Sequence, residues 1–266
     1  MRILRFAQRC WKSGVLVLLW LVLGSPRVWA GPPFLTDDPQ TVEFQHWELY
    51  VASTDFKTIG GWVGDGPHVE INYGVVPNVQ LHVIAPVAYS SPKEGTGHYG
   101  YGDTELGVKF RFVQESKNVP MIGIFPLLEV PTGSAREGLG TGRVHALLPV
   151  WLQKTWGPWT AYGGGGYGIN PGLGLQDYGF VGGLLQCQVA KPVLIGAEVY
   201  HQTASEVGGR DETAFNVGTV IDLSEMHHLL FSAGRSINGP TDFQCYFAYQ
   251  FTFDNSLFGF GKHAPK

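Results

Sequence analysis

GDTELGVKFRFV, residues 102–113, alternates charged and apolar side chains without a break. Successive side chains of a β-strand point to opposite faces, so one face of this stretch carries Asp103, Glu105, Lys109 and Arg111. The other face carries threonine, leucine, valine and two phenylalanines. A single strand of this kind suits a soluble sandwich as well as a membrane barrel, so the rest of the chain has to decide between them.

The same alternation recurs about twelve times between residues 41 and 253, which is typical of transmembrane β-barrels with an apolar exterior and a polar interior. Short turns and long glycine-containing loops alternate between these segments. The sequence therefore predicts an all-β fold, a transmembrane antiparallel up-and-down β-barrel of about 12 strands with both termini in the periplasm. The expected strands are 41–54, 67–73, 79–87, 102–113, 121–130, 143–154, 159–168, 178–189, 193–202, 211–223, 228–237 and 242–253.

Loop length predicts the orientation of this barrel, because bacterial outer-membrane barrels have long extracellular loops and short periplasmic turns. The long segments 88–101, 131–142 and 169–177 are therefore expected outside the cell. The short segments 114–118 and 190–192 are expected in the periplasm.

The first 30 residues have the pattern of a secretory signal peptide. Four basic residues precede an apolar run at 15–23, and Val28-Trp29-Ala30 supplies the residues expected at a cleavage site. The apolar run is far shorter than the roughly 20 residues that a membrane-spanning helix needs. We expect export with cleavage after Ala30, followed by residence in the outer membrane of a Gram-negative cell.

The composition of the remaining chain fits a membrane barrel and argues against nucleic acid as a partner. Loss of the signal peptide leaves 13 basic residues against 22 acidic ones, and an acidic protein repels phosphate backbones. The mean hydropathy of the full 266-residue chain is +0.01, because alternating lipid-facing and lumen-facing residues cancel in the average. The expected partners are outer-membrane lipids, small organic solutes and, during biogenesis, the barrel-assembly machinery.

Two flanking segments complete the expected domain organisation. Residues 31–40 are rich in proline and contain Thr36-Asp37-Asp38-Pro39, so we expect a periplasmic lead-in that cannot pair in a β-ladder. The barrel is expected over 41–253, and residues 254–266 form a C-terminal tail.

The inward faces of the expected strands collect charged side chains. If the turn after the second strand centres near Val76, Glu70 lies opposite His82. A similar count places Glu129 opposite Asp103, and two facing carboxylates call for a cation such as Arg143 between or beside them. The residues expected to line the lumen are Glu70, His82, Asp103, Glu105, Lys109, Arg111, Glu129, Arg143 and Glu198.

The sequence argues against an enzyme and against a metal or other cofactor. An outer-membrane hydrolase would need outward serine and histidine side chains at workable offsets, and no Gly-x-Ser-x-Gly motif is present. His227 and His228 are adjacent, so their rings point to opposite faces of a strand and do not form a joint metal site.

Several short motifs resemble the outer-membrane transporter-like family associated with the meta-pathway of phenol degradation. They are Pro33-Phe34 with residues 36–39, the segment 70–81 around Asn72-Tyr73-Gly74, and the segment 102–110. The resemblance implies an outer-membrane channel proposed to pass aromatic or other small organic compounds. It implies no particular site residues.

Two hypotheses for the function follow from the charged lumen. A barrel of about twelve strands lies between eight-stranded barrels filled by side chains and the open porins of 16 to 18 strands. In the first hypothesis the charges line a narrow path for passive diffusion, with an acidic ring at Asp103 and Glu105 above a basic ring at Lys109 and Arg111. In the second, the charges pair and plug the lumen, and the barrel acts as a structural anchor or surface-loop scaffold.

Overall fold

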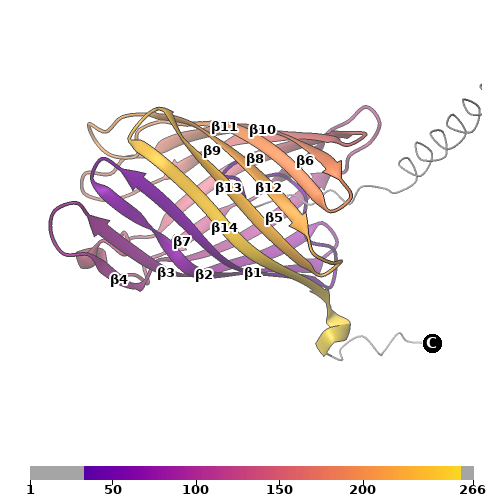
Figure 1. Ribbon diagram of the computed structural model, residues 1–266, viewed down its shortest axis with the longest axis horizontal. Coiled ribbons are helices and arrows are strands. Elements are labelled where there is room, and N and C mark those ends of the chain that lie inside the picture. The colour runs from indigo at the N-terminus through magenta and orange to yellow at the C-terminus, as the bar shows by residue number, and fades with distance from the viewer. Residues whose placement is uncertain (1–32, 259–266) are drawn as a thin grey trace, which may run out of the picture.

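The computed structural model describes residues 33–258, which form one closed antiparallel β-barrel with tilted strands (Figure 1). The expected signal peptide, its cleavage site and the end of the C-terminal tail lie outside the described residues. No helix within 33–258 is long and apolar enough to cross a membrane. Two short 3-10 turns, η1 (Ala135–Glu137) and η2 (Asn255–Phe258), accompany the strands.

The strands follow one another around the barrel in the order of the sequence. They are β1 (His46–Thr58), β2 (Gly61–Val76), β3 (Val79–Pro92), β4 (His98–Tyr101), β5 (Thr104–Val113), β6 (Met121–Ile124), β7 (Leu127–Val130), β8 (His145–Trp156), β9 (Trp159–Ile169), β10 (Tyr178–Ala190), β11 (Val193–Gln202), β12 (Glu212–Asp222), β13 (His227–Asn238) and β14 (Thr241–Asp254).

Two of the barrel strands are interrupted, so these segments make twelve strands. β3 pairs with both β4 and β5 on one side, and β8 pairs with both β6 and β7. β1 pairs with β14 along its whole length, which closes the barrel. The expected twelve-stranded antiparallel barrel is therefore confirmed.

The interruption between β6 and β7 falls at Phe125-Pro126, inside the single strand expected over 121–130. Proline has no N–H to give to the ladder, so pairing stops there. Phe125 turns into the barrel, where its ring packs at right angles to that of His82 with 5.2 Å between the centroids. The break therefore places an aromatic side chain in the lumen.

The two ends of the barrel differ. We call one end the turn end. It carries the start of β1, the end of β14 and short connections such as 157–158 and 191–192. The other, here the loop end, carries the longer segments 131–144, 170–177 and 203–211. Their positions relative to the cell surface remain a prediction.

The alternation of short and long connections is not strict, because the loop end also contains two-residue links at 59–60 and 239–240. The expected strands 41–54 and 67–73 end and begin too far from the link at 59–60, so the sequence did not predict this tight turn. β1 and β2 instead continue to a tight turn, where Gly61 adopts a φ of 139° that favours glycine.

Side-chain exposure follows the alternation that the opening stretch predicts. Leu106 and Val108 are 43% and 45% exposed on the outside of β5. Lys109, the residue after Val108, is only 3% exposed. Large apolar side chains cover the exterior of the other strands in the same way. Such a surface is stable in lipid and unfavourable in water.

Candidate channel lumen

Residues 33–43, here the inner segment, run through the barrel interior. None of these residues belongs to a strand, as expected for 33–40 of the proline-rich lead-in but not for 41–43, which were expected in the first strand. The segment does not stay outside the barrel, however, because Thr36, Asp38 and Val42 are almost fully buried against its inner wall. β1 consequently begins at His46, five residues later than expected.

A buried carboxylate on β11 holds the first part of the inner segment. Glu198 accepts hydrogen bonds from the backbone N–H groups of Leu35 and Thr36, at 3.0 and 2.7 Å, and from the Asn216 side chain at 2.6 Å. It is 2% exposed. Hydrogen bonds to an ionised acceptor are stronger than neutral ones, so Glu198 fixes the backbone of the inner segment to the wall.

Glycines in the wall leave room for the inner segment. A Cβ atom at Gly196 of β11 would lie 3.0 Å from the Phe34 ring, and one at Gly123 of β6 would lie 3.0 Å from Cβ of Pro39. A side chain at either position would therefore press on the segment. The aromatic ring and the proline ring take the space that wall side chains would otherwise fill.

Basic residues of β5 hold the second part. Lys109 Nζ lies 3.0 Å from Asp37 Oδ1 and 4.7 Å from the centroid of the Phe125 ring. Arg111 donates to Gln40 and, at the turn end, to Asn78. The expected basic ring is thus engaged by the inner segment and by a turn.

The Asp38 carboxyl is buried beside this ion pair. Its Oδ1 accepts the backbone N–H of Gln40 at 2.6 Å, and its Oδ2 has no hydrogen-bond partner among residues 33–258. Burial raises the pKa of Asp38 to about 8, against the lowering effect of the nearby Lys109 ammonium.

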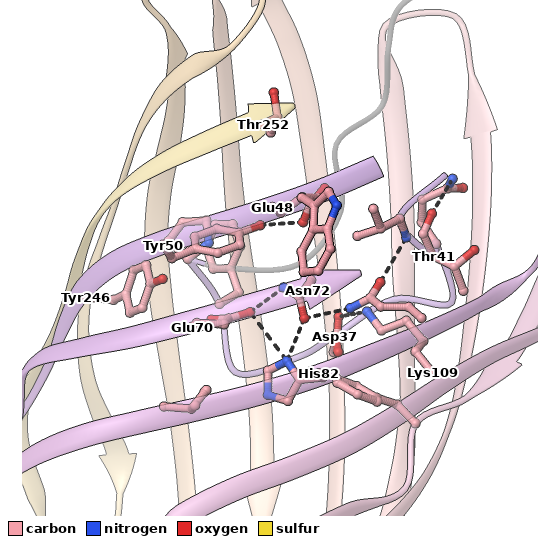
Figure 2. Close-up of a pocket in the computed structure, with 18 of the residues that line it drawn as sticks. Asp37, Thr41, Glu48, Tyr50, Glu70, Asn72, His82, Lys109, Tyr246 and Thr252 are labelled. Carbon is pink, nitrogen blue, oxygen red and sulfur yellow. Dashed lines mark hydrogen bonds and ion pairs between the residues drawn. The ribbon is translucent and has the colours of Figure 1, made fainter. Parts of the chain in front are cut away.

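A cavity of about 1100 Å³ remains beside the inner segment. Its lining runs from Glu225 and Asp254 at the turn end to Phe56 and Leu147 in the loop half of the barrel. Figure 2 shows its centre, where side chains of five strands lie together: Glu48 and Tyr50 of β1, Glu70 of β2, His82 of β3, Lys109 of β5 and Tyr246 of β14. The barrel interior is therefore narrowed by the inner segment and is not filled.

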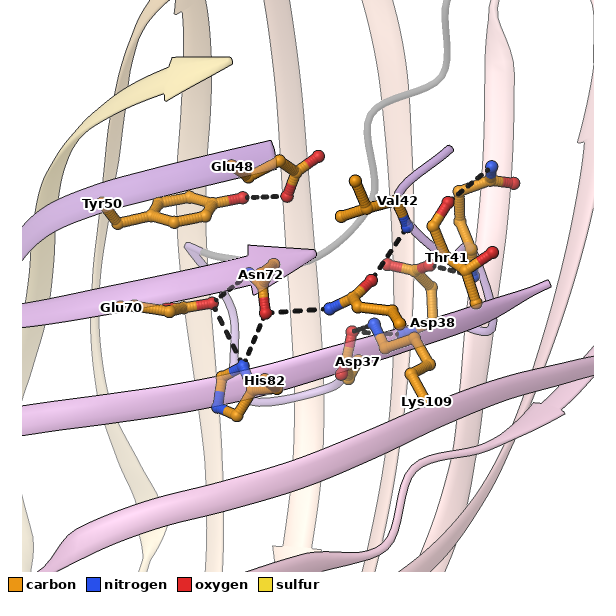
Figure 3. A network of polar contacts seen from close by, with 12 residues as sticks. Asp37, Asp38, Thr41, Val42, Glu48, Tyr50, Glu70, Asn72, His82 and Lys109 are labelled. Atoms are coloured by element: carbon orange, nitrogen blue, oxygen red, sulfur yellow. Dashed lines mark hydrogen bonds and ion pairs between the residues drawn. The ribbon is translucent and has the colours of Figure 1, made fainter. Parts of the chain in front are cut away.

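A hydrogen-bonded network crosses the cavity wall and reaches the inner segment (Figure 3). Asn72 Oδ1 accepts from His82 Nδ1 and from Gln80, and Gln80 Oε1 accepts the backbone N–H of Val42. His82 Nε2 lies 2.9 Å from Glu105 Oε1. Both ring nitrogens of His82 face oxygen acceptors, so the ring donates twice, as only an imidazolium can.

The nine residues expected to line the lumen separate into three groups. Glu70, His82, Glu105 and Lys109 line the cavity. Glu198 and Arg111 bind the inner segment. Asp103, Glu129 and Arg143 lie near the loop end, outside the cavity lining.

Two registers differ from the expectation. Asn72, not Glu70, pairs with His82, because the turn centres at residues 77–78. Glu129 pairs with Glu105 and not with Asp103, whose carboxylate instead accepts the backbone N–H groups of Gly133 and Thr141. The side chain of Arg143 is exposed and forms no ion pair within the described residues.

Sequence reasoning missed the inner segment as a lumen element. The residues expected to line the lumen also omitted Glu48, Tyr50 and Tyr246, which line the centre of the cavity. The signal for the segment was present in Thr36-Asp37-Asp38-Pro39, whose two carboxylates match the inward basic residues of β5.

Comparison with known proteins gives a likeness of fold. No family model and no curated protein matches the chain. The crystal structure of an outer-membrane channel from Pseudomonas putida F1 superposes with a TM-score of 0.68 at 16% identity, over 81% of this chain and 98% of that one. The fold is that of an outer-membrane β-barrel.

More distant likenesses include the toluene transporter TodX of P. putida, with a TM-score of 0.37 at 7% identity over 79% of this chain and 88% of that one. The outer-membrane channel DcaP of Acinetobacter baumannii has a TM-score of 0.34 at 7% identity, over 80% of this chain and 99% of that one. The resemblance to the family of the phenol meta-pathway stays a prediction.

Proposed function

We propose that this protein is an outer-membrane channel that passes small organic solutes by passive diffusion along the cavity beside the inner segment. The observation that carries the proposal is the combination of an apolar exterior with a cavity of about 1100 Å³, lined by apolar, aromatic and charged side chains, inside a closed barrel. Cavities lined mainly by apolar and aromatic side chains with a few placed polar groups are typical of sites for small organic molecules. The likeness to an outer-membrane channel supports the same reading.

The chemistry of the lining suggests solutes with an aromatic or apolar body and a polar group. Phe34, Tyr50, Phe125 and Trp151 face the cavity together with the carboxylates. The family resemblance of the sequence points to aromatic compounds as well. The proposal includes no catalytic step.

Conductance of the purified barrel in planar bilayers, with solute entry into swelling liposomes, tests the channel. We expect small, well-defined conductance steps and entry of small organic solutes. A correctly folded barrel that conducts nothing and admits no solute would contradict the proposal. It would favour the alternative of a closed barrel that anchors surface loops, with the inner segment as its plug.

The proposed location in the outer membrane has its own test on the two faces of β5. Val108→Arg places a charge on the exterior, which costs roughly 2–4 kcal/mol near the centre of a bilayer. Glu105→Gln, on the inward face, should assemble almost normally. The heat-modifiable gel shift of a folded barrel, measured in outer-membrane fractions, separates the two variants. Equal assembly of both would show that the outer face does not meet lipid.

A further inference from the structure

The connection between β7 and β8, residues 131–144, folds back into the barrel at the loop end. We call it the mouth loop. Tyr99 and Tyr101 of β4 are 65% and 49% exposed and point outward, so Gly100 between them belongs to the inner face of that strand. A Cβ atom at Gly100 would lie 3.2 Å from Leu139 Cδ1. The mouth loop therefore lies against the inside of the wall.

Leu139 anchors the mouth loop in a notch of the wall. It is 4% exposed and is the one buried residue among 131–144. The notch exists because the inward residues of β3 and β4 at this height are small, with Ala88 paired to Gly100 and Ser90 one inward position farther along β3. Burial of a leucine side chain in such a notch holds the loop against the wall.

Asp103 ties both limbs of the mouth loop to the start of β5. Its carboxylate accepts the backbone N–H of Gly133 at 2.9 Å, the backbone N–H of Thr141 at 2.7 Å and the Thr141 hydroxyl at 2.9 Å. A Cβ atom at Gly140 would overlap this carboxylate, so glycine permits the approach. Hydrogen bonds to an ionised acceptor are stronger than neutral ones, so the seated loop depends on Asp103.

The mouth loop lies where the cavity ends on one side of the barrel. On β1 the cavity lining reaches Phe56, two residues before the end of the strand. On β3 and β5 it stops at Ile84 and Glu105. The next inward residue on β5 toward the loop end is Asp103, which binds the mouth loop. A solute that enters from the loop end therefore passes between the mouth loop and β1.

We propose that the mouth loop is a lid that limits the size of the solutes entering the cavity, with Leu139 and Asp103 as the residues that position it. The inference rests on the proposed channel function and adds selection by size at the loop end, because pore width decides which solutes pass. None of the residues 131–144 belongs to a strand, so release of the lid leaves the ladders of the barrel intact.

Asp103→Asn tests the lid with little change in side-chain volume. The new NH2 group cannot accept a hydrogen bond from Gly133 or Thr141, so hydrogen exchange in residues 131–144 should accelerate roughly tenfold. Single-channel conductance should rise, and liposomes should admit a disaccharide faster relative to a pentose. Leu139→Ala removes the anchor without changing a charge and should shift the same ratio. Exchange in the inner segment should stay as it is.

Asp177→Asn is the matched control. Asp177 ties the loop 170–177 in the same manner, with 2.8 Å to the backbone N–H of Asn170 and 2.8 Å to the Tyr167 hydroxyl. This loop joins β9 and β10, away from β3 and β5 in the order of the strands. The control should leave the conductance and the ratio of entry rates unchanged. An equal rise in both variants would show that any loosened loop widens the mouth, and the lid would be wrong.

A reversible cross-link tests the position of the lid directly. A Cβ atom at Gly138 would lie 3.9 Å from Cβ of Ser90, within the range of a disulfide. Ser90→Cys and Gly138→Cys are combined with Asp103→Asn in a chain whose Cys187 and Cys245 are replaced by serine. Oxidation should return the ratio of entry rates to the wild-type value, and a reducing agent should raise it again. A cross-link that forms and leaves the raised ratio unchanged would overturn the proposal.

The same measurements separate the lid from the channel. A wild-type barrel that conducts, with Asp103→Asn and Leu139→Ala conducting and sorting sugars as the wild type does, would sink the lid and leave the channel. Absence of conductance in the wild type and in both variants, although exchange shows the mouth loop released, would sink the channel itself. The gel shift of a folded barrel, measured on every variant, restricts these comparisons to assembled protein.

Discussion

Glu198 and Glu70 are equivalent in the strand pattern, since both point inward and are almost fully buried, yet they sit on two different walls of the lumen. Glu198 belongs to the covered wall, formed by β10 to β13, against which residues 33–36 pack. Glu70 belongs to the cavity wall, formed by β1, β2, β3 and β5. The two carboxylates differ in the number of hydrogen bonds they accept. Glu198 accepts three, whereas Glu70 accepts one, from the Asn72 side chain.

The comparison teaches how to tell a structural carboxylate from one available to a ligand. A buried carboxylate with several donors is stabilised as an anion and rigidifies its surroundings. A buried carboxylate with an oxygen atom facing a cavity can be stabilised by a hydrogen-bond donor or a cation that enters that cavity. The covered wall should therefore control docking of the inner segment, and the cavity wall should control which solute is held.

The largest effect is expected for Glu198→Ala, which leaves the backbone donors of Leu35 and Thr36 without an acceptor. Hydrogen bonds to charged groups contribute about 1.5–3 kcal/mol each and are not additive, so docking of the inner segment should weaken by roughly 2–5 kcal/mol. Hydrogen exchange of residues 33–43, followed by mass spectrometry, should show loss of protection. Single-channel conductance should rise.

Glu70→Gln is the matched control on the cavity wall. It should leave the exchange of the inner segment unchanged, because the network through Asn72 and Gln80 keeps its donors and acceptors. If the two variants released the segment to the same extent, the distinction between the walls would be wrong.

The second prediction concerns Lys109→Gln, which leaves Asp37 without its cation. Removal of one charge-assisted bond should weaken docking by roughly 1.5–3 kcal/mol, again seen as faster exchange in residues 33–43. Lys154→Gln removes an ion pair of similar length, 3.1 Å to Glu115, away from the inner segment. That control should leave the exchange as it is.

The barrel was predictable because lipid outside and polar groups inside force a period of two on every strand. Leu106, Val108 and Lys109 each lie on the face that this period assigns. The ends of strands were harder, since β1 and β2 continue through a glycine turn whose residues also suit a long loop. When the pairing of two strands shifts by two residues, each side chain keeps its face of the sheet but lies opposite a different residue. For this reason Asn72, and not Glu70, lies opposite His82.

The inner segment was not predictable from periodicity, because it has none. Its structure depends on partners about 160 residues away, such as Glu198, and on the absence of side chains at positions such as Gly196. In the sequence alone, Glu198 can be interpreted as a charge lining the lumen and Gly196 as a flexible strand residue. Only the closed barrel brings them together.

The third prediction tests that fit by steric means. Gly196→Val introduces a Cβ about 3.0 Å from the Phe34 ring, and overpacking of this kind costs about 1–2 kcal/mol. Exchange in the inner segment should accelerate, and Phe34→Ala in the same chain should restore barrel stability. Gly183→Val is the control on the neighbouring strand, where a Cβ meets nothing within 4 Å. Equal effects of both valines would mean that the wall, and not Phe34, resists the change.

The smallest effect is expected for Asp38→Asn at pH 4. The carboxyl is exposed before docking, with an ordinary pKa near 4, and its pKa is about 8 when docked. The docked state therefore binds the extra proton between these values, and docking is strongest at low pH and weakens as the pH rises toward 8. At pH 4 the docked carboxyl is protonated and resembles the asparagine amide, and about half of the undocked carboxyls are protonated, so the variant should match the wild type within about 0.5 kcal/mol. Between pH 4 and pH 8 the wild-type segment should lose exchange protection, corrected for the intrinsic pH dependence of exchange, and the variant should not. Identical pH profiles would show that Lys109 keeps Asp38 ionised and that the carboxyl belongs to the ion pair with Asp37.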